Sequence, residues 1–251
     1  MKTKMITTII ILLVFYVAYG LFLYFFQKSF IYFPSQSSFY ECPFFSQDEI
    51  REYNGTRFYF REGNNKLIVV YHGNAGRACN RAHFISSIDP SYSYLIVEYS
   101  GYGGDSDLPS KKNILQDVKN IVSFTQDLDK EVYLFGESIG SSVASYHASL
   151  DKPEGLIMIA PFHSLASVAN SQFPIYPVRL LLTQNYDTSN YLKGYEGRVL
   201  IFHGTSDRTV PPRESEKLAE ELSNVQRVTY DRAHNNLYSD ELFEEVRGFI
   251  R

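Results

Sequence analysis

Ser138 is the residue of this chain whose surroundings most clearly suggest chemistry. It lies in EVYLFGESIGSS, residues 131–142, where an apolar run gives way to small residues, and Gly136 and Gly140 stand two positions to either side of it. A nucleophilic serine in a sharp strand-to-helix turn needs small neighbours at those positions, because its own backbone is strained. The pattern indicates a nucleophile, and an ordinary packing turn is the alternative interpretation.

A serine hydroxyl is a weak nucleophile unless a positioned base takes its proton. His234, in YDRAHNN, directly follows a predicted strand and is the candidate base. Asp207, in VLIFHGTSDRTVPP, follows another predicted strand and is the candidate acid that orients the imidazole. Asp231 and Asp240 are closer to His234 in sequence. Asp207 is better placed, because the carboxyl ends of parallel strands share one edge of a sheet.

The attack of such a serine on a carbonyl creates an oxyanion, which needs N–H donors. One predicted donor is the backbone N–H of Ile139, at the start of the helix that follows the serine. The other is the N–H of Asn74, with Ala75 as the weaker alternative. Asn74 lies in VVYHGNAG, where a strand enters a loop that contains Gly73 and Gly76.

The remaining histidines have weaker claims to chemistry. His72 precedes Gly73, and we expect it to order the loop rather than to act as a base. His203, in the sequence FHG, is expected to be structural. No pattern around the others assigns them a role: His83, His147 and His163.

Short apolar runs alternate with helical patterns through the rest of the chain. Strands are predicted in TRFYFRE, NKLIVVYHG, SYSYLIVEYSG, EVYLFG, GLIMIAPF, RVLIFHG and QRVTYDRA, and helices in KKNILQDVKNIVSFTQDL, SIGSSVASYHASL, PPRESEKLAEELS and NLYSDELFEEVRGFI. This alternation predicts an α/β fold, with a mostly parallel sheet covered by helices on both faces. Residues 163–197 interrupt this alternation, because no strand is predicted among them. They form either a lid or cap over the strand ends or a plain crossover between two strands.

The first thirty residues differ from the rest. No charge occurs between Lys4 and Lys28, and this apolar stretch is long enough to cross a bilayer. A cleaved signal peptide is the alternative, but the apolar run is long and no small-residue cleavage site follows it. We expect a tail at 1–5, one transmembrane signal anchor at 6–26, a juxtamembrane connector at 27–55 and the domain at 56–251.

Charge predicts the orientation of that anchor. Lys2, Lys4 and the terminal amine precede it, and acidic residues soon follow Lys28. The positive-inside tendency therefore places the N-terminus in the cytoplasm and the domain on the opposite side of the membrane.

Composition sets further bounds. The chain has 251 residues, a formal net charge of −4 and 21% charged residues, which suits a globular domain plus one apolar segment and gives no sign of nucleic-acid binding. Cys42 and Cys79 form no metal motif, and we expect two independent thiols, since they could pair only in an oxidising compartment. No metal, no cofactor and no oligomeric state is indicated.

Taken together, these motifs resemble the α/β-hydrolase superfamily. The chain looks most like membrane-anchored hydrolase-domain proteins of the bud-emergence type and the related serine aminopeptidase-like domains. The matching pieces are FIYFPS, YHGNAG, VEYSGYGGDSDLPS, GESIGSS, APFHSLASVA, FHGTSDRTVPP and AHNN, which cover nearly all of the chain after residue 30. The order Ser138, Asp207, His234 is also that of α/β-hydrolases.

The resemblance implies a serine hydrolase that acts on carboxylic esters or thioesters, with Ser138, Asp207 and His234 as a catalytic triad. Substrates of such an enzyme include lipids and lipidated proteins. Two alternatives stay open: a peptidase of the aminopeptidase-like type, which would need an acidic anchor for the substrate amine, and a tethered binding module without activity. The sequence departs from the family pattern at Ser100, where arginine is common, and at Ser141 and Ala233, where glycine is frequent.

Overall fold

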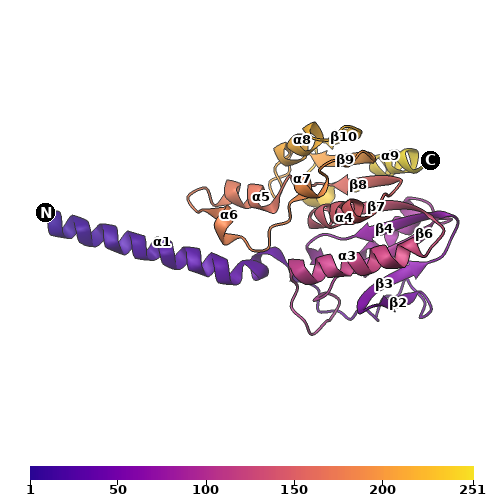
Figure 1. The fold of residues 1–251 in the computed structure, drawn as a ribbon, viewed down its shortest axis with the longest axis horizontal. Helices are drawn as coiled ribbons and strands as arrows, with labels where there is room; N and C mark the ends of the chain where they lie inside the picture. Colours follow the sequence, from indigo (N-terminus) through magenta and orange to yellow (C-terminus); the bar gives the residue numbers. More distant parts are fainter.

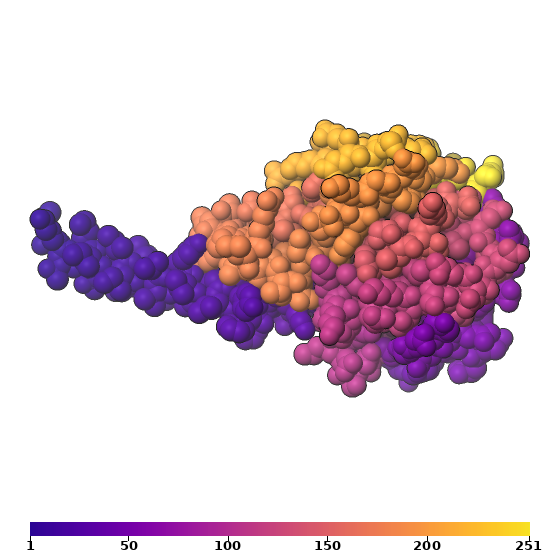
Figure 2. Space-filling model, viewed as in Figure 1, coloured from indigo at the N-terminus to yellow at the C-terminus, as the bar shows by residue number.

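The computed structural model describes residues 1–251 as a long N-terminal helix that projects from an α/β domain (Figure 1). The helix, α1 (Lys2–Ile31), leaves the domain as a rod, and most of its length is uncovered in the space-filling view (Figure 2). Its amino end is the farthest point of the molecule from the sheet.

An eight-stranded sheet forms the centre of the domain. In spatial order its strands are β10 (Val225–Tyr230), β9 (Arg198–Gly204), β8 (Gly155–Ile159), β7 (Glu131–Glu137), β4 (Lys66–Tyr71), β6 (Ser93–Glu98), β3 (Thr56–Arg61) and β2 (Ile50–Tyr53). Only β3 runs against the others, since it pairs antiparallel with both β6 and β2. The predicted α/β class with a mostly parallel sheet is confirmed.

The central strands are apolar along most of their length, as expected for a sheet that is covered on both faces. Along β4, Leu67 and Val69 belong to one hydrophobic cluster, and Ile68 and Val70 belong to the other, so successive side chains enter opposite layers. Helices α3, α4 and α8 pack on the first face, and α2 and α9 on the second, as predicted.

The helices have the following bounds: α2 (His83–Ser87), α3 (Lys111–Gln126), α4 (Ile139–Leu150), α5 (Leu165–Gln172), α6 (Val178–Leu181), α7 (Thr188–Tyr191), α8 (Arg213–Glu220) and α9 (Asp240–Ile250), with 3₁₀ turns η1 (Ala78–Arg81) and η2 (His234–Asn236). Serine side chains cap three of them: Ser110 for α3, Ser164 for α5 and Ser239 for α9. Each cap satisfies a backbone N–H that the first helical turn leaves without a partner.

Two segments extend the sequence-based description. Strand β2 lies within the predicted connector, and a two-residue strand β1 (Phe33–Pro34) pairs with β5 (Ala75–Gly76) in the loop after β4. Residues 163–197, called the insertion below, contain α5, α6 and α7 and no strand. In Figure 1, α5 and α6 lie beside the carboxyl half of α1.

Cys42 and Cys79 form a disulfide bond, so the expectation of two independent thiols is wrong. The bond connects the segment before β2 to η1, and both cysteines are buried in the same hydrophobic cluster. Sequence separation alone could not reveal this pairing, because it depends on the path of the connector across the sheet.

Removing this disulfide by the double substitution Cys42→Ala and Cys79→Ala is expected to destabilise the domain. The bond closes a loop with a sequence separation of 37 residues, and a loop of this size corresponds to about 4 kcal/mol of lost chain entropy in the unfolded state. Thermal unfolding should show a Tm lowered by roughly 10 °C. A phosphine reductant should produce a similar shift in the wild type and none in the variant, and an unchanged Tm in the variant would contradict the role of the bond.

Candidate active site

Ser138 sits at the junction of β7 and α4 with a backbone that few residues adopt. Its φ is +53° and its ψ is −117°. Such a conformation is strained for any residue with a Cβ, and it persists only where the surroundings hold it. Here the Ser138 N–H donates to the carbonyl of Ile159, at 2.8 Å, so the neighbouring strand β8 fixes the turn.

The glycines around Ser138 are required by close packing. A Cβ on Gly136 would lie 2.4 Å from the Gly140 carbonyl oxygen, and one on Gly140 would lie 2.2 Å from the carbonyl oxygen of Tyr71. Ser141, noted above as a departure from the pattern that the resemblance implies, donates its hydroxyl to the Gly136 carbonyl at 2.9 Å. This hydrogen bond braces the same turn.

The structure brings Ser138, His234 and Asp207 together from three strand ends. The Ser138 Oγ lies 3.2 Å from Nε2 of His234, and Nδ1 of His234 lies 2.6 Å from Oδ2 of Asp207. In the tautomer that fits both contacts, Nδ1–H donates to the carboxylate and Nε2 accepts from the serine hydroxyl. This is the arrangement in which an imidazole can take the serine proton.

The environment of Asp207 keeps it ionised. Burial of the carboxyl favours its neutral form, but hydrogen bonds from His203 and His234 and from the N–H of Val210 outweigh this and hold the pKa of Asp207 well below its usual value. Its Oδ1 accepts the N–H groups of Thr209 and Val210 at 2.8 and 2.9 Å. Asp207 is therefore a fixed negative charge that can stabilise a protonated His234.

Asn74 and Ile139 present unpaired backbone N–H groups beside Ser138. Neither amide donates to any acceptor in the protein, and both residues line the cavity that contains the serine. Ile139 is the first residue of α4, where an N–H has no partner within the helix, and Asn74 is half-buried. Two free N–H donors beside a nucleophile suit a transient oxyanion. Ala75, the weaker alternative, is exposed and does not line this cavity.

The loop that carries Asn74 is tied down on several sides. His72 Nδ1 lies 2.7 Å from the Gly73 carbonyl, and the Tyr99 hydroxyl donates to the carbonyl of His72 at 2.8 Å. The carbonyl of Asn74 accepts from the Tyr102 hydroxyl at 2.9 Å. His72 is buried within this network.

The other candidate residues lie elsewhere. His203 is buried behind Asp207 and contacts the Val210 carbonyl at 2.9 Å. Asp231 accepts from the hydroxyls of Thr205 and Ser206 instead of binding His234. His147 is buried against the Tyr71 hydroxyl, and burial lowers its pKa to about 4.

One supporting residue was not anticipated from the sequence. Glu137, inside the G-x-S-x-G pattern, receives two hydrogen bonds from the Arg81 guanidinium, at 2.6 and 2.7 Å, and one from the Tyr238 hydroxyl, at 2.7 Å. It thereby links the serine turn to η1 and to the segment after His234. A carboxylate directly before the candidate nucleophile, at the end of an apolar strand, is the sequence signal that could have suggested such a partner.

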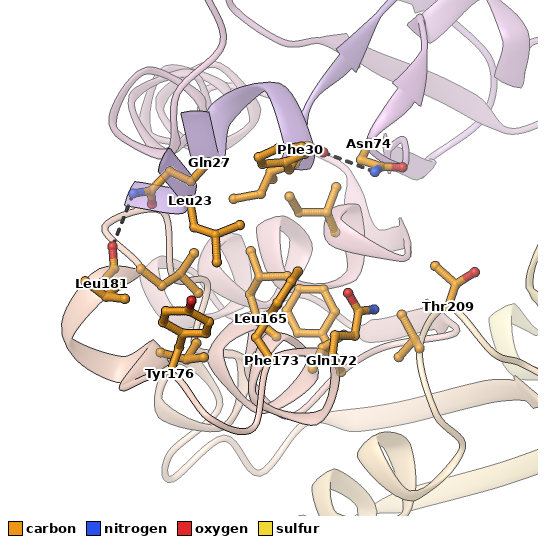
Figure 3. A pocket seen from close by; sticks show the side chains of 18 of the residues that line it. Leu23, Gln27, Phe30, Asn74, Leu165, Gln172, Phe173, Tyr176, Leu181 and Thr209 are labelled. Carbon is orange, nitrogen blue, oxygen red and sulfur yellow. Dashed lines mark hydrogen bonds between the residues drawn. The ribbon is translucent and has the colours of Figure 1, made fainter. Parts of the chain in front are cut away.

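A cavity of about 390 Å³ opens from Ser138, and apolar side chains form most of its wall. Its lining includes no aspartate, glutamate, lysine or arginine. Figure 3 shows that the lining residues come from three places: the end of α1, the insertion, and the loops at the carboxyl edge of the sheet. The residues labelled there include Leu23 and Phe30 of α1, Leu165 and Phe173 of the insertion, and Thr209.

The contribution of α1 to this cavity was missed in the sequence. Its signal is Gln27, a polar residue near the end of an otherwise apolar helix. The Gln27 Oε1 accepts from the N–H groups of Thr183 and Gln184, at 2.8 and 3.1 Å, and its Nε2 donates to the Leu181 carbonyl at 3.2 Å (Figure 3). Such contacts span about 150 residues of sequence and cannot be read from local patterns.

Comparison with known proteins gives a consistent picture. No protein-family model matches the chain. The uncharacterized protein Rv2307c of Mycobacterium tuberculosis is 30% identical over 198 residues, which is 75% of this chain and 70% of that protein. In solved structures, Est1E of Butyrivibrio proteoclasticus with bound ferulic acid aligns with a TM-score of 0.65 and 20% identity, covering 80% of this chain and 97% of that one. The esterase PF2001 of Pyrococcus furiosus aligns with a TM-score of 0.66 and 17% identity, covering 88% and 97%.

Proposed function

Since the chain belongs to the same family as Rv2307c of Mycobacterium tuberculosis and has the α/β-hydrolase fold, we propose that it is a membrane-anchored serine hydrolase that cleaves carboxylic ester or thioester bonds. The observation that carries the proposal is the position of His234, 3.2 Å from the hydroxyl of Ser138 and 2.6 Å from the carboxylate of Asp207. The assignment to the bud-emergence type, with its N-terminal anchor, is part of the same proposal.

The reaction proceeds through an acyl-enzyme. Ser138 Oγ attacks the substrate carbonyl carbon while its proton passes to Nε2 of His234, and Asp207 stabilises the resulting imidazolium. The N–H groups of Asn74 and Ile139 bind the oxyanion. As the carbonyl–oxygen or carbonyl–sulfur bond breaks, His234 returns the proton to the leaving group. Water then attacks the acyl-enzyme and gives a proton to His234, which passes it to Oγ of Ser138 as the carbonyl–oxygen bond breaks and the acid leaves. Each proton transfer in these steps passes through His234.

Helix α1 supports the membrane anchor. It is 30 residues long with a mean hydropathy of 2.5 in its most apolar window, and only Gly20 and Gln27 are buried within the protein. An apolar helix with so little protein cover is stable only in an apolar surrounding such as a bilayer. The hydrogen bonds of Gln27 to the insertion favour retention of the helix over its cleavage as a signal peptide, because cleavage would leave those polar groups without partners.

The disulfide supports the proposed orientation. A bond between Cys42 and Cys79 forms and persists in an oxidising compartment, which lies outside the cytoplasm. The charge bias around α1 points the same way. The N-terminus would then be cytoplasmic, with the domain on the opposite side of the membrane.

The cavity favours esters over peptides. A peptidase that recognises a free amino terminus needs a carboxylate near its pocket, and none lines this cavity. A binding module without activity would have no need for a serine in a strained backbone beside a paired histidine and aspartate. The mostly apolar lining suits an acyl group.

The proposal is tested with the full-length protein in detergent. The substrates are p-nitrophenyl butyrate, a butyryl thioester and alanine p-nitroanilide. We expect hydrolysis of the ester and the thioester and no release from the anilide. Faster cleavage of the anilide would indicate a peptidase. A folded protein that hydrolyses none of the three would indicate a binding module.

A further inference from the structure

The wall that α1 and the insertion form around the cavity carries an inference about the substrate. The part of the insertion nearest α1, residues 172–182, is called the insertion tip below. Its sequence is QFPIYPVRLLL, with one charged residue. The side chains of Ile175 and Leu180 are 71% and 82% exposed, although they are large and apolar. Exposed apolar patches of this kind mark contact with a membrane or a partner.

The insertion tip packs against the middle of α1. The Tyr16 hydroxyl donates to the Ile175 carbonyl at 2.8 Å, and the rings of Tyr16 and Tyr176 stack with centroids 4.6 Å apart. Gly20 permits this approach, since a Cβ there would lie 3.2 Å from the ring of Tyr176. Gln27 holds the other end of the insertion tip through the Leu181 carbonyl.

These contacts place the insertion tip at membrane depth. Lys28 marks the end of the uncharged stretch, so Gln27 lies near the membrane surface. Tyr16 is eleven residues earlier, which is about 16 Å along a helix with a 1.5 Å rise. The hydrocarbon core is about 30 Å thick, so half of it is about 15 Å. Ile175, bound to Tyr16, would therefore lie deep within the leaflet that faces the domain.

The cavity connects that depth to the nucleophile. Its apolar lining runs from Tyr19 and Leu23 of α1 and Tyr176 of the insertion tip to Ser138 and the free N–H of Asn74. Figure 3 shows Leu23 and Tyr176 at one side of the cavity and Asn74 and Thr209 at the other. The oxyanion loop is attached to the same helix, because Asn74 Nδ2 donates to the Ile31 carbonyl at 3.1 Å.

We propose that the substrate is a long fatty acyl group, in ester or thioester linkage, that enters this cavity sideways from the bilayer between α1 and the insertion tip. The inference rests on the proposed serine hydrolase and specifies its substrate class. Moving a methylene from an apolar medium into water lowers an equilibrium constant about fourfold, so a long chain that passed through water would be strongly disfavoured. A passage walled by the anchor itself keeps the chain in apolar surroundings until its carbonyl reaches Ser138.

The position of the insertion tip is tested without any activity measurement. The chain has no tryptophan, so a single introduced tryptophan is the only source of indole fluorescence. The variant Ile175→Trp is reconstituted in phosphatidylcholine vesicles with and without brominated acyl chains, which quench nearby indole fluorescence. Leu21→Trp, on α1, is the control within the bilayer. Leu150→Trp is the control outside it, because α4 starts at Ile139, directly after Ser138, and ends at Leu150, at the opposite edge of the sheet. We expect the fluorescence of a tryptophan at position 175 to be quenched as strongly as that of a tryptophan at position 21. Quenching at position 175 that is no stronger than at position 150 would overturn the inference.

The passage is tested by the dependence of activity on chain length. Leu23 lines the cavity, so Leu23→Trp narrows it from the side of α1. Leu21→Trp is the matched control, because it also replaces a leucine of α1 with tryptophan but Leu21 does not line the cavity. We expect Leu23→Trp to lower the ratio of palmitoyl to butyryl ester hydrolysis, measured as kcat/KM in vesicles, at least tenfold. Leu21→Trp should leave the ratio as in the wild type. Equal ratios in all three proteins would contradict the proposed passage.

Two membrane-bound substrates distinguish the sources of the acyl group. Dipalmitoyl phosphatidylcholine and an S-palmitoyl peptide are each placed in the vesicles, and palmitate release is measured. Release from either one supports the inference and identifies the source. If the wild type hydrolyses a soluble butyryl ester but neither of these, the inference is wrong and the proposed function stands. If it hydrolyses no ester at all, both fail.

Discussion

Ser138→Ala is expected to lower kcat for ester hydrolysis by about 10⁴- to 10⁶-fold, the range found when the nucleophile of a serine hydrolase is removed. The acyl-enzyme cannot form without the Oγ atom, and only oxyanion binding and substrate positioning remain. The cavity keeps its shape, because the Ser138 side chain caps no helix and its N–H still bonds to Ile159. KM should therefore change little, and the loss should appear in kcat for a soluble ester.

Ser142→Ala is the matched control for this experiment. Ser142 lies on α4, the helix that follows Ser138, is fully buried, and has a hydroxyl without a hydrogen-bond partner. Its removal leaves the residues around Ser138 in place, so kcat should stay close to that of the wild type. A Ser138→Ala protein with wild-type activity would eliminate the proposed nucleophile, whatever the control shows.

Asp207→Asn is expected to lower kcat by about 10³- to 10⁴-fold with little change in KM, and the geometry explains why. Oδ1 of Asp207 accepts two backbone N–H groups, from Thr209 and Val210, so an asparagine oxygen must occupy that position. The amide nitrogen then faces His234, where it can only donate. Nδ1 of His234 must accept, its proton moves to Nε2, and Nε2 can no longer take the proton of Ser138.

Asp231→Asn provides the comparison for this second variant. Asp231 lies in the neighbouring loop and accepts only from the hydroxyls of Thr205 and Ser206, which an asparagine oxygen can also do. Its kcat should remain close to the wild-type value. Comparable losses in the two variants would point to a general electrostatic or folding effect and would contradict the specific role of Asp207.

Much of the fold and site could be predicted because local patterns determine them. The apolar strands are buried on both faces, and their composition reveals this directly. Ser138 and Asp207 each follow such a strand, and His234 follows the half-exposed edge strand β10. A parallel sheet brings the carboxyl ends of these strands to one edge. Gly136 and Gly140 mark the turn because a Cβ at either position would collide with the backbone.

The features that escaped prediction depend on long-range contacts. The disulfide requires the connector to cross the sheet and bring Cys42 to η1. The cavity wall requires α1 to meet the insertion, through pairs such as Tyr16 and Ile175 that are 159 residues apart. Strand β2 is short and half-exposed, so its sequence, IREY, has no distinct apolar pattern. In each case the residue types permit the contact, but only the folded chain selects it.

The central claim is that Ser138 is an activated nucleophile, and covalent labelling tests it most directly. The full-length protein in detergent is treated with a fluorophosphonate probe, and the modified peptide is identified by mass spectrometry. The account predicts one adduct, on Ser138, that is absent from Ser138→Ala and forms far more slowly in Asp207→Asn. Folded wild-type protein that forms no adduct, or forms it on another serine, would contradict the account.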